Sequence, residues 1–436
     1  MPKRVVLATA GTLGDLHPFI AIAIRLAERG FDVAIATSPD FRDNILAEGL
    51  TFHPVGPSRD DVLRDLRIDI RELGRRIIKD TMFVLEGACF PYLKVMYEDL
   101  LPVIDGASLV LASSLMFSAR FAAEKRGIPQ MTVALQPMVF VSAFDPPSLS
   151  PAPWLAPLLR KLGPGVTRAV YGAAKRFATR RARPLYAFRR QLGLPETGAD
   201  LLFEGQFSAL GTLATYSNLL GLVRSDYPPN TTITGFTFYD RSTLQSSAHA
   251  SELEEFLSSG APPLVFTLGS LAVEFPGDFY RVSCKVAREL GRRAVLLVGA
   301  HEVGSYRVVR SESIFVCDYA PFSVLFPRAV AVIHHGGIGT VGQALRAGKP
   351  QLVIPFHTDQ FDNAARLVRL GVARSVRLKQ YEHSRAAAEL SILLSQGSYS
   401  SRAAAVANQV RTEDGAEVSA RVVDSVLGVP TTGHIG

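Results

Sequence analysis

Uninterrupted apolar runs alternate along the chain with segments in which apolar residues recur every three to four positions. The run at 3–11 (KRVVLATAG) ends in glycine, residues 17–30 have helical spacing, and 31–38 (FDVAIATS) is a second apolar run. A continuous apolar, β-branched run predicts a buried strand, and the recurrence predicts an amphipathic helix. Strand, glycine turn, helix and strand in this order are the right-handed crossover unit of a parallel sheet.

The same alternation continues beyond this first unit and is interrupted once. Residues 225–262 are polar and rich in proline, glycine and serine, which is typical of a linker. Because an α/β half flanks this linker on either side, we expect ligands to bind between the halves, at the carboxyl ends of their strands. Further strands are predicted at 108–114, 130–137, 263–270, 293–299, 313–319, 329–335 and 351–356, and further helices at 117–127, 277–291 and 340–348.

Length, composition and cysteine content indicate a folded, two-domain protein of a reducing compartment. The chain has 436 residues, more than one core usually supports. Apolar residues make up 47% and charged residues 20%, which excludes a disordered chain. Three scattered cysteines form no disulfide framework, and the first apolar run is too short for a secretion signal or a membrane span. We therefore expect a cytoplasmic protein without a transmembrane helix.

The net charge of +7 comes from one segment of the chain. Between Pro146 and Pro195 there is no acidic residue, and without the ten cations found there 37 basic residues face 40 acidic ones. No nucleic-acid-binding motif accompanies these cations, so we expect no nucleic acid partner. Apolar residues interleave with the cations over 160–190, which fits a basic amphipathic surface resting on an anionic membrane or binding an acidic acceptor. A solvated helical face is the alternative, and the pattern leaves both interpretations open.

The stretch AVIHHGGIGT at 331–340 places two histidines and three glycines between a predicted strand and a predicted helix. The first N–H groups of a helix lack intrahelical acceptors, and glycine lets a ligand approach them closely. With His335 beside it, this turn predicts an anion site, most naturally for a diphosphate. A metal site is disfavoured, because His334 and His335 point to opposite faces of an extended chain and no acidic or cysteine ligand has matching spacing. A turn without a ligand is the remaining alternative.

Two further turns carry polar residues next to predicted strands. Asp359 and Gln360 follow the strand at 351–356 and offer a carboxylate and a carboxamide to several sugar hydroxyls. Asp15 and His17 follow the first strand, where a general base for an acceptor hydroxyl would stand. The alternative for both aspartates is that each caps the helix that follows it.

These stretches resemble the signature of the family 1 glycosyltransferases, inverting enzymes that use nucleotide sugars and have the GT-B fold. The resemblance implies two Rossmann-like, doubly wound parallel-sheet domains that face each other across a cleft. Residues 1–235 would bind the acceptor and residues 236–410 the nucleotide sugar, with a helix and tail over 411–436 crossing back to the first domain. The matching positions are His335, Gly337, Thr340, Ala344-Leu345, Pro350, Pro355 and Asp359-Gln360, extended by GTLGDLHP at 11–18 and VFTLGS at 265–270.

The resemblance also implies a role for each matched residue. Asp15 would be the catalytic base, with His17 on the acceptor side. No metal and no cofactor beyond the nucleoside diphosphate sugar is implied, because a histidine and a helix end can stabilise the leaving group. The remaining roles would be donor diphosphate binding by His335, Gly337, Gly339, Thr340, His334 and Ser270 (beside Gly269), sugar binding by Asp359 and Gln360, and base and ribose binding by Tyr319 and Gln343.

One position and three stretches of the sequence indicate which donor and acceptor the resemblance implies. Gln343 stands where most members carry a glutamate for the ribose hydroxyls, which favours a deoxythymidine donor without a 2′-hydroxyl. The stretches at 41–50, 263–270 and 359–371 resemble bacterial rhamnosyltransferases of rhamnolipid synthesis. That resemblance implies transfer from dTDP-rhamnose to an apolar acceptor, a hydroxyacyl lipid, with peripheral residence on the inner membrane face. The alternative is a UDP-glucose-dependent transferase acting on a sterol, polyketide or other small apolar aglycone.

Overall fold

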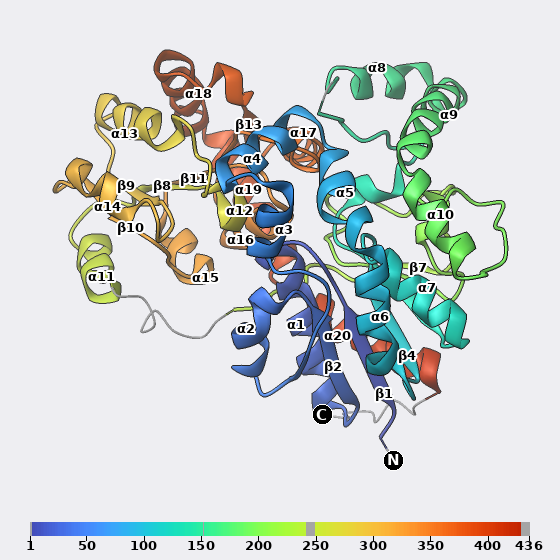
Figure 1. The fold of residues 1–436 in the computed structure, drawn as a ribbon. Helices are drawn as coiled ribbons and strands as arrows, with labels where there is room; N and C mark the ends of the chain where they lie inside the picture. The colour runs from blue at the N-terminus through green and yellow to red at the C-terminus, as the bar shows by residue number, and fades with distance from the viewer. Residues whose placement is uncertain (1, 151, 241–248, 429–436) are drawn as a thin grey trace.

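The structure is a computed structural model that describes residues 2–150, 152–240 and 249–428, and two parallel β-sheets form its framework (Figure 1). All neighbouring strands of both sheets are parallel. In the described ranges the first sheet has the order β3 (Thr51–Pro54), β2 (Asp32–Thr37), β1 (Arg4–Ala8), β4 (Leu109–Ser113), β5 (Gln130–Ala134), β6 (Thr212–Ala214) and β7 (Thr231–Ile233). The second has the order β10 (Ile314–Cys317), β9 (Ala294–Leu297), β8 (Leu264–Thr267), β11 (Ala331–His334), β12 (Gln351–Val353) and β13 (Ala373–Ser375).

Both sheets reverse their strand order at one place, between β1 and β4 and between β8 and β11. Parallel strands end at the same edge of a sheet, and where their order reverses the connecting loops part and leave a crevice for a ligand. The turn after β1 leads into α1 (Leu13–Glu28), and the turn after β11 leads into α16 (Ile338–Ala347). The turns that contain Asp15 and His335 therefore lie at the two crevices where a ligand is expected to bind.

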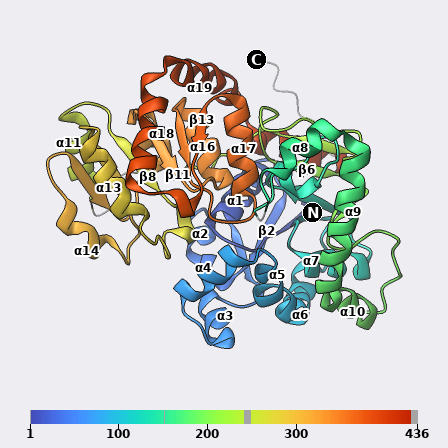
Figure 2. The same cartoon turned by 90° about the horizontal axis from the view of Figure 1, so that it is seen from above.

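Helices pack on the two faces of each sheet (Figures 1 and 2). Alternate residues of β1 show this directly, since Val6 and Ala8 lie in one buried cluster and Val5 and Leu7 in another. In the N-terminal half the other helices are α2 (Arg42–Leu46), α3 (Arg59–Leu66), α4 (Ile70–Lys79), α5 (Phe83–Ala88), α6 (Leu93–Ile104), α7 (Phe117–Arg126), α8 (Leu155–Leu162), α9 (Pro164–Arg181) and α10 (Arg183–Gln191). In the C-terminal half they are α11 (Ala250–Ser258), α12 (Gly269–Ala272), α13 (Phe279–Glu289), α14 (Val303–Tyr306), α15 (Phe322–Leu325), α17 (Gln360–Leu370), α18 (His383–Ser395) and α19 (Gly397–Val410), followed by α20 (Gly415–Leu427).

The chain passes between the halves at two neighbouring points. The Gly415 N–H donates to the carbonyl of Phe236 at 3.1 Å, and Glu413 accepts a hydrogen bond from the Phe236 N–H at the same distance. A side chain at Gly415 would stand 2.7 Å from the Phe236 carbonyl oxygen, so the two crossings can lie this close only because that residue is glycine. The crossings form one narrow connection.

The last helix, α20, packs on the N-terminal half although the residues before it belong to the other half. Ala420 and Val423 are buried in the cluster that contains α1. Arg29, at the end of α1, forms ion pairs with Glu417 and Asp424 of α20. Burial of apolar side chains accounts for most of the attachment, because ion pairs near the surface contribute little. None of the helices in the described ranges has the length and apolarity of a membrane span.

The predicted α/β architecture with two doubly wound parallel sheets is confirmed. Four short strands at or next to the sheet edges were not predicted: β3, β6, β7 and β13 have three or four residues and lack an apolar run. α1 begins at Leu13, before the predicted helix at 17–30, so Asp15 lies in its first turn. The segment 225–262 contains β7, and its residues 241–248 lie outside the described ranges. The division of the chain into domains at residues 235 and 410 stays a prediction.

Candidate active site

The carboxyl edges of the two sheets enclose a cavity of about 410 Å³. The turns after β1, β5 and β6 line one side of it, and the turns after β8, β10, β11 and β12 line the other. The fold therefore brings together stretches that are more than 300 residues apart in the sequence. The predicted site residues that line this cavity are Asp15, His17, Gly269, Ser270, Tyr319, His335, Gly337, Gly339, Thr340, Gln343, Asp359 and Gln360.

The His335 side chain fills the space between two glycine turns. A Cβ at Gly269 would lie 2.6 Å from the imidazole Cε1, and a Cβ at Gly337 would overlap its Nε2. The ring can occupy this position only because both residues lack a side chain. Burial, and then the nearby His334 and His357, lower the pKa of His335 well below its usual value, so the free protein holds the ring neutral at pH 7. Its buried Nδ1 has no hydrogen-bond partner among the described residues.

His334 lies in the core, and the expectation that it contacts the donor diphosphate is corrected by its position. It is fully buried at the end of β11 and does not line the cavity. Its Nδ1 accepts a hydrogen bond from the Gly336 N–H at 3.1 Å, so its proton is on Nε2, which donates to Oε1 of Gln351 at 2.9 Å. Both nitrogens are used, and burial lowers the pKa of His334 to about 4. His334 therefore holds the glycine turn in place.

The start of α16 offers positive partial charge beside His335. Its N-cap is Gly337, which has no side chain to accept a hydrogen bond from the first N–H groups. An uncapped helix N-terminus attracts anions, and the first turn of this helix lines the cavity. Ser270, exposed at the start of α12, offers a hydroxyl from the neighbouring turn. In the described ranges no group of three or more His, Cys, Asp or Glu side chains could hold a metal ion.

Asp359 stands just before α17, behind an unusual backbone conformation. Thr358 has φ = 45°, in the left-handed region that residues other than glycine rarely adopt. The Asp359 side chain does not cap the helix, so the capping alternative is wrong for this residue. Its Oδ2 accepts a hydrogen bond from Nδ2 of Asn363 at 2.9 Å. The carboxylate is thereby held toward the cavity that it lines.

Gln360 is held by the same turn. Its Oε1 accepts hydrogen bonds from the N–H groups of Phe356 at 2.8 Å and His357 at 3.2 Å. Its Nε2 lies 3.2 Å from Nε2 of His357. Because the carboxamide oxygen is occupied, the NH₂ group is the part of Gln360 that can reach a sugar hydroxyl.

The Asp15 side chain caps α1 and also lines the cavity. Its Oδ2 accepts hydrogen bonds from the Thr12 N–H at 2.7 Å and the Thr12 hydroxyl at 3.1 Å, which completes a capping box with Thr12 as the N-cap. A Cβ at Gly11, which has φ = 131°, would stand 2.6 Å from the Asp15 carboxyl carbon. Burial raises the pKa of Asp15, and its bonds to Thr12 counteract part of that rise. The capping interpretation is thus correct, and it leaves the carboxylate on the cavity wall.

Two carboxylates from opposite halves of the protein face the same space. Burial, and next the charge of Asp15, raise the pKa of Asp359 to about 7. Two like charges in a desolvated cavity repel, so Asp359 keeps its proton to a higher pH than an exposed aspartate does. Hydroxyl groups of a ligand placed between them would donate hydrogen bonds to both and relieve this repulsion.

Gln343 and Tyr319 line the cavity together with Phe238 and Asp240. Nε2 of Gln343 donates to Asp240 at 3.1 Å, and its Oε1 accepts from Arg346 at 2.8 Å. Arg346 also pairs with Asp240 at 2.7 Å and stacks on the Phe238 ring at 4.1 Å. Tyr319 is nearly half exposed and belongs to the cavity wall. This part of the cavity wall combines aromatic rings with polar groups that already bond to one another.

Sequence reasoning missed the contribution of the segment 236–240 (FTFYD). All five of its residues line the cavity, and the Tyr239 ring lies 5.1 Å from the ring of His17. The segment was interpreted as linker because of its polar surroundings, but its three aromatic residues were a usable signal. The apolar stretches at 81–93 and 138–144 do not line the cavity. Their residues Phe90 and Phe140 are buried in the core instead.

The cavity contains a buried carboxylate and an uncapped helix N-terminus, an arrangement compatible with a nucleotide-sugar transferase of the GT-B type. Residues 5–144 match the glycosyltransferase family 28 N-terminal domain, and residues 295–424 match the erythromycin biosynthesis protein CIII-like C-terminal domain. Glycosyltransferase GtfC of Amycolatopsis orientalis is 31% identical over 429 residues, which cover 96% of this chain and 97% of that protein.

Two further similarities agree with this assignment. The O-mycaminosyltylonolide 6-deoxyallosyltransferase of Streptomyces fradiae is 29% identical over 439 residues, or 99% of both chains. The structure of the glycosyltransferase VinC in complex with dTDP superimposes with a TM-score of 0.66 at 19% identity, over 98% of this chain and 100% of that one. The chain belongs to this family of glycosyltransferases, enzymes that take a sugar from a nucleotide donor.

If Asp15 is the catalytic base, Asp15→Asn lowers kcat by about 10² to 10⁴ and leaves the dissociation constant of dTDP within about twofold. The asparagine keeps an oxygen for Thr12 but takes up no proton. Initial rates and calorimetric dTDP titration measure the two effects. The matched control is Asp61→Asn, because Asp61 closes an equivalent capping box with Ser58 at the start of α3. Equal activity of Asp15→Asn and Asp61→Asn would reduce Asp15 to a helix cap.

The raised pKa of Asp359 makes a prediction about stability. An unfolded aspartate titrates near about pH 3.9, whereas Asp359 titrates at about 7 in the folded protein. Between these values the folded state holds more protons, so the free energy of unfolding falls as pH rises. Asp359→Asn removes this cost and stabilises the nucleotide-free protein above pH 7 by about 2–4 kcal/mol. The gain disappears toward pH 4.

Urea unfolding at a series of pH values measures this gain. Asp105→Asn, at an exposed position after α6, is the control and should follow the parent protein at every pH. A gain for Asp359→Asn that does not depend on pH would contradict the assigned pKa.

Proposed function

We propose that this glycosyltransferase transfers a sugar with inversion from a dTDP-activated donor, with dTDP-rhamnose favoured, to a hydroxyl of an apolar acceptor such as a hydroxyacyl lipid. One observation carries the proposal: Asp15 of one half and Asp359 of the other share a cavity in which the charge of Asp15 acts on Asp359. One carboxylate can activate the acceptor while the other holds the sugar. Inversion requires the acceptor to attack the face of the anomeric carbon opposite the leaving diphosphate, so the base and the diphosphate site must lie on opposite sides of the sugar.

In the proposed reaction the acceptor oxygen attacks the anomeric carbon while Asp15 takes the hydroxyl proton. The bond from the anomeric carbon to the diphosphate oxygen breaks, and its electron pair leaves with the nucleoside diphosphate. The N–H groups at the start of α16, together with His335 and Ser270, stabilise the negative charge that grows there. A nearby diphosphate favours a charged imidazole, so donor binding opposes the effect of burial on the pKa of His335.

The preference for a deoxythymidine nucleotide rests on Gln343. Its carboxamide is already bonded to Asp240 and Arg346, so it has less to offer a ribose 2′-hydroxyl than an unpaired carboxylate would have. The preference for an apolar acceptor rests on Leu13, Pro18 and Leu135, which line the cavity near Asp15. Transfer to a small apolar aglycone from UDP-glucose or a dTDP-sugar is the second candidate. It is favoured by the Streptomyces fradiae relative, whose name gives O-mycaminosyltylonolide as its acceptor.

We further propose that α8 and α9 contact an anionic membrane. They lie at the rim of the N-terminal half, away from the second sheet (Figure 1). Trp154 and Phe177 are 62% and 63% exposed, and Leu158, Leu162 and Val166 are exposed beside them. Four cations of the segment pair with acidic side chains. The other six have no ion pair among the described residues and can face lipid phosphates: Lys161, Arg168, Arg176, Arg180, Arg183 and Arg190.

Nucleotide preference is tested by thermal shift. At equal concentration dTDP is expected to raise the melting temperature more than UDP does, because only bound ligand stabilises the folded state. Transfer from dTDP-rhamnose to a 3-hydroxyacyl lipid, followed by mass spectrometry, then tests the reaction. It is expected to proceed in EDTA, since the helix end and His335 supply the positive charge. A larger shift with UDP and transfer only to a polyketide aglycone would favour the second candidate.

Membrane contact is tested by sedimentation with vesicles. The protein is expected to bind phosphatidylglycerol vesicles and not pure phosphatidylcholine, with binding weakened by salt. Trp154→Ser combined with Phe177→Ser should abolish this binding. Val308→Ser, at an 86% exposed apolar residue on the other half, is the control and should bind as the parent does. Equal vesicle binding by the parent and both variants would refute the proposal that α8 and α9 contact the membrane.

A further inference from the structure

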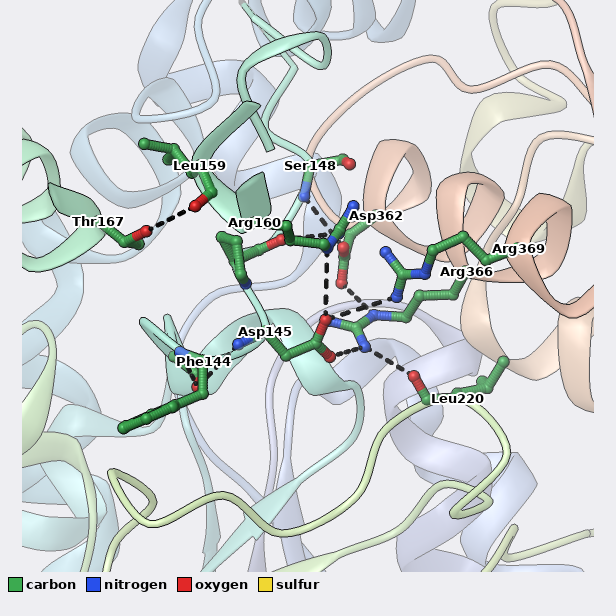
Figure 3. Close-up of polar contacts among 12 residues, drawn as sticks. Phe144, Asp145, Ser148, Leu159, Arg160, Thr167, Leu220, Asp362, Arg366 and Arg369 are labelled. Carbon is green, nitrogen blue, oxygen red and sulfur yellow. Dashed lines mark hydrogen bonds and ion pairs between the residues drawn. The ribbon is translucent and has the colours of Figure 1, made fainter. Parts of the chain in front are cut away.

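The helix that carries the sugar-binding pair also carries a buried ionic cluster (Figure 3). Asp359 and Gln360 lie at the start of α17, and Asp362, Arg366 and Arg369 follow on its next turns. Asp145 and Arg160, from the N-terminal half, complete this group, which we call the interdomain cluster. None of these five residues lines the cavity. The catalytic chemistry described above does not use them.

Arg366 lies at the centre of the interdomain cluster. Its Nη1 forms an ion pair with Asp145 and donates to the carbonyl of Leu220 at 2.6 Å, both in the N-terminal half. Its Nε donates to Asp362 at 2.6 Å on its own helix. The Ser148 N–H donates to the other oxygen of Asp362 at 3.0 Å. Three groups of the N-terminal half thus bind two neighbouring side chains of α17.

Burial makes this contact sensitive to the relative position of the halves. Asp145, Asp362 and Arg366 are 8%, 0% and 3% exposed. Burial alone would raise the pKa of Asp145, but the charges of Arg366, Arg369 and Arg160 outweigh it and lower the pKa. Asp145 and Arg366 are therefore ionised, and a buried charge that loses its partner is strongly destabilised. Any other relative orientation of the halves would leave a charge unpaired. The interdomain cluster therefore selects one orientation.

Both sides of the cluster are rigidly attached to parts of the site. On the donor side, Nδ2 of Asn363 donates to Asp359 and to the carbonyl of Gly336, each at 2.9 Å, so α17 is tied to the sugar carboxylate and the glycine turn. On the acceptor side, Asp226 accepts hydrogen bonds from the Ser142 hydroxyl and the Ala143 N–H, each at 2.7 Å. The segment 142–149 is thus fixed at its N-terminal end before it meets α17.

We infer that Asp145 and Arg366 are positioning residues that lock the acceptor-binding half against α17. They hold the Asp359 carboxylate at the correct separation from Asp15, which comes from the other half. This inference rests on the proposed division of roles between the halves and not on which sugar or acceptor is used. Loosening the lock reduces transfer while the C-terminal half continues to bind the nucleotide.

Amide hydrogen exchange of the nucleotide-free protein tests the lock without any substrate. Asp145→Asn removes the charge, keeps the shape and leaves Arg366 paired with Asp362. Exchange is expected to rise in two separate segments, 142–149 and 359–363. Glu389→Gln is the matched control, because Glu389 is equally buried and pairs with Arg374 within the C-terminal half alone. A rise confined to 142–149, or the same pattern in the control, would overturn the inference.

Kinetics with the donor that the enzyme turns over test the consequence. Asp145→Asn is expected to lower kcat about tenfold or more while the dissociation constant of dTDP changes less than about twofold, a coupling typical of linked sites. Asp226→Ala, which frees the segment 142–149 without touching a buried charge, should shift kcat in the same direction. Equal losses in kcat and dTDP affinity, or unchanged kcat in both variants, would contradict the assignment. If no donor is turned over, the proposed function fails while the exchange result still decides on the lock.

Discussion

The imidazole of His335 fits between two turns only because residues 269 and 337 carry no side chain. The rest of the donor site depends on this packing. The two turns follow β8 and β11, which are neighbours in the sheet at the point where the strand order reverses. The reversal opens the crevice, the glycines admit the ring, and the uncapped start of α16 lies beside it. A strand order, two missing side chains and one helix end thus make the anion site together.

A second constraint relates the two halves to each other. The chain crosses between them at one place, where Gly415 lies against Phe236. The interdomain cluster lies along α17, away from that crossing, and opposes rotation with charges that are costly to separate. Asp15 and Asp359 approach each other only when the two halves have the relative orientation that the interdomain cluster selects. The helix α17 is the element that joins the N-terminal half, the Asp359 carboxylate and the glycine turn after β11.

Features that depend on local sequence could be predicted, and those that depend on distant pairing could not. The glycine turn after β11 was predicted because strand, glycine and helix start are adjacent in the chain, whereas Gly269 and Ser270 after β8 were expected only from the family resemblance. Strands such as β6 and β13 have three residues each and owe their existence to their neighbours in the sheet. The position of His334 depends on Gln351, seventeen residues away, and no local pattern reports it. The ion pair of Asp145 with Arg366 spans 221 residues, and no local sequence pattern reports this pairing.

The central claim is that the turn holding His335 binds the nucleoside diphosphate, and calorimetric titration of dTDP into Gly337→Ala tests it most directly. Gly337 has an ordinary negative φ, so alanine costs the backbone little and its methyl group only displaces the imidazole. Gly172→Ala, on α9 with open space around it, is the control. The account predicts at least about tenfold weaker dTDP binding by Gly337→Ala, as expected for overpacking, and parent-like binding by Gly172→Ala. Parent-like binding by Gly337→Ala would contradict it.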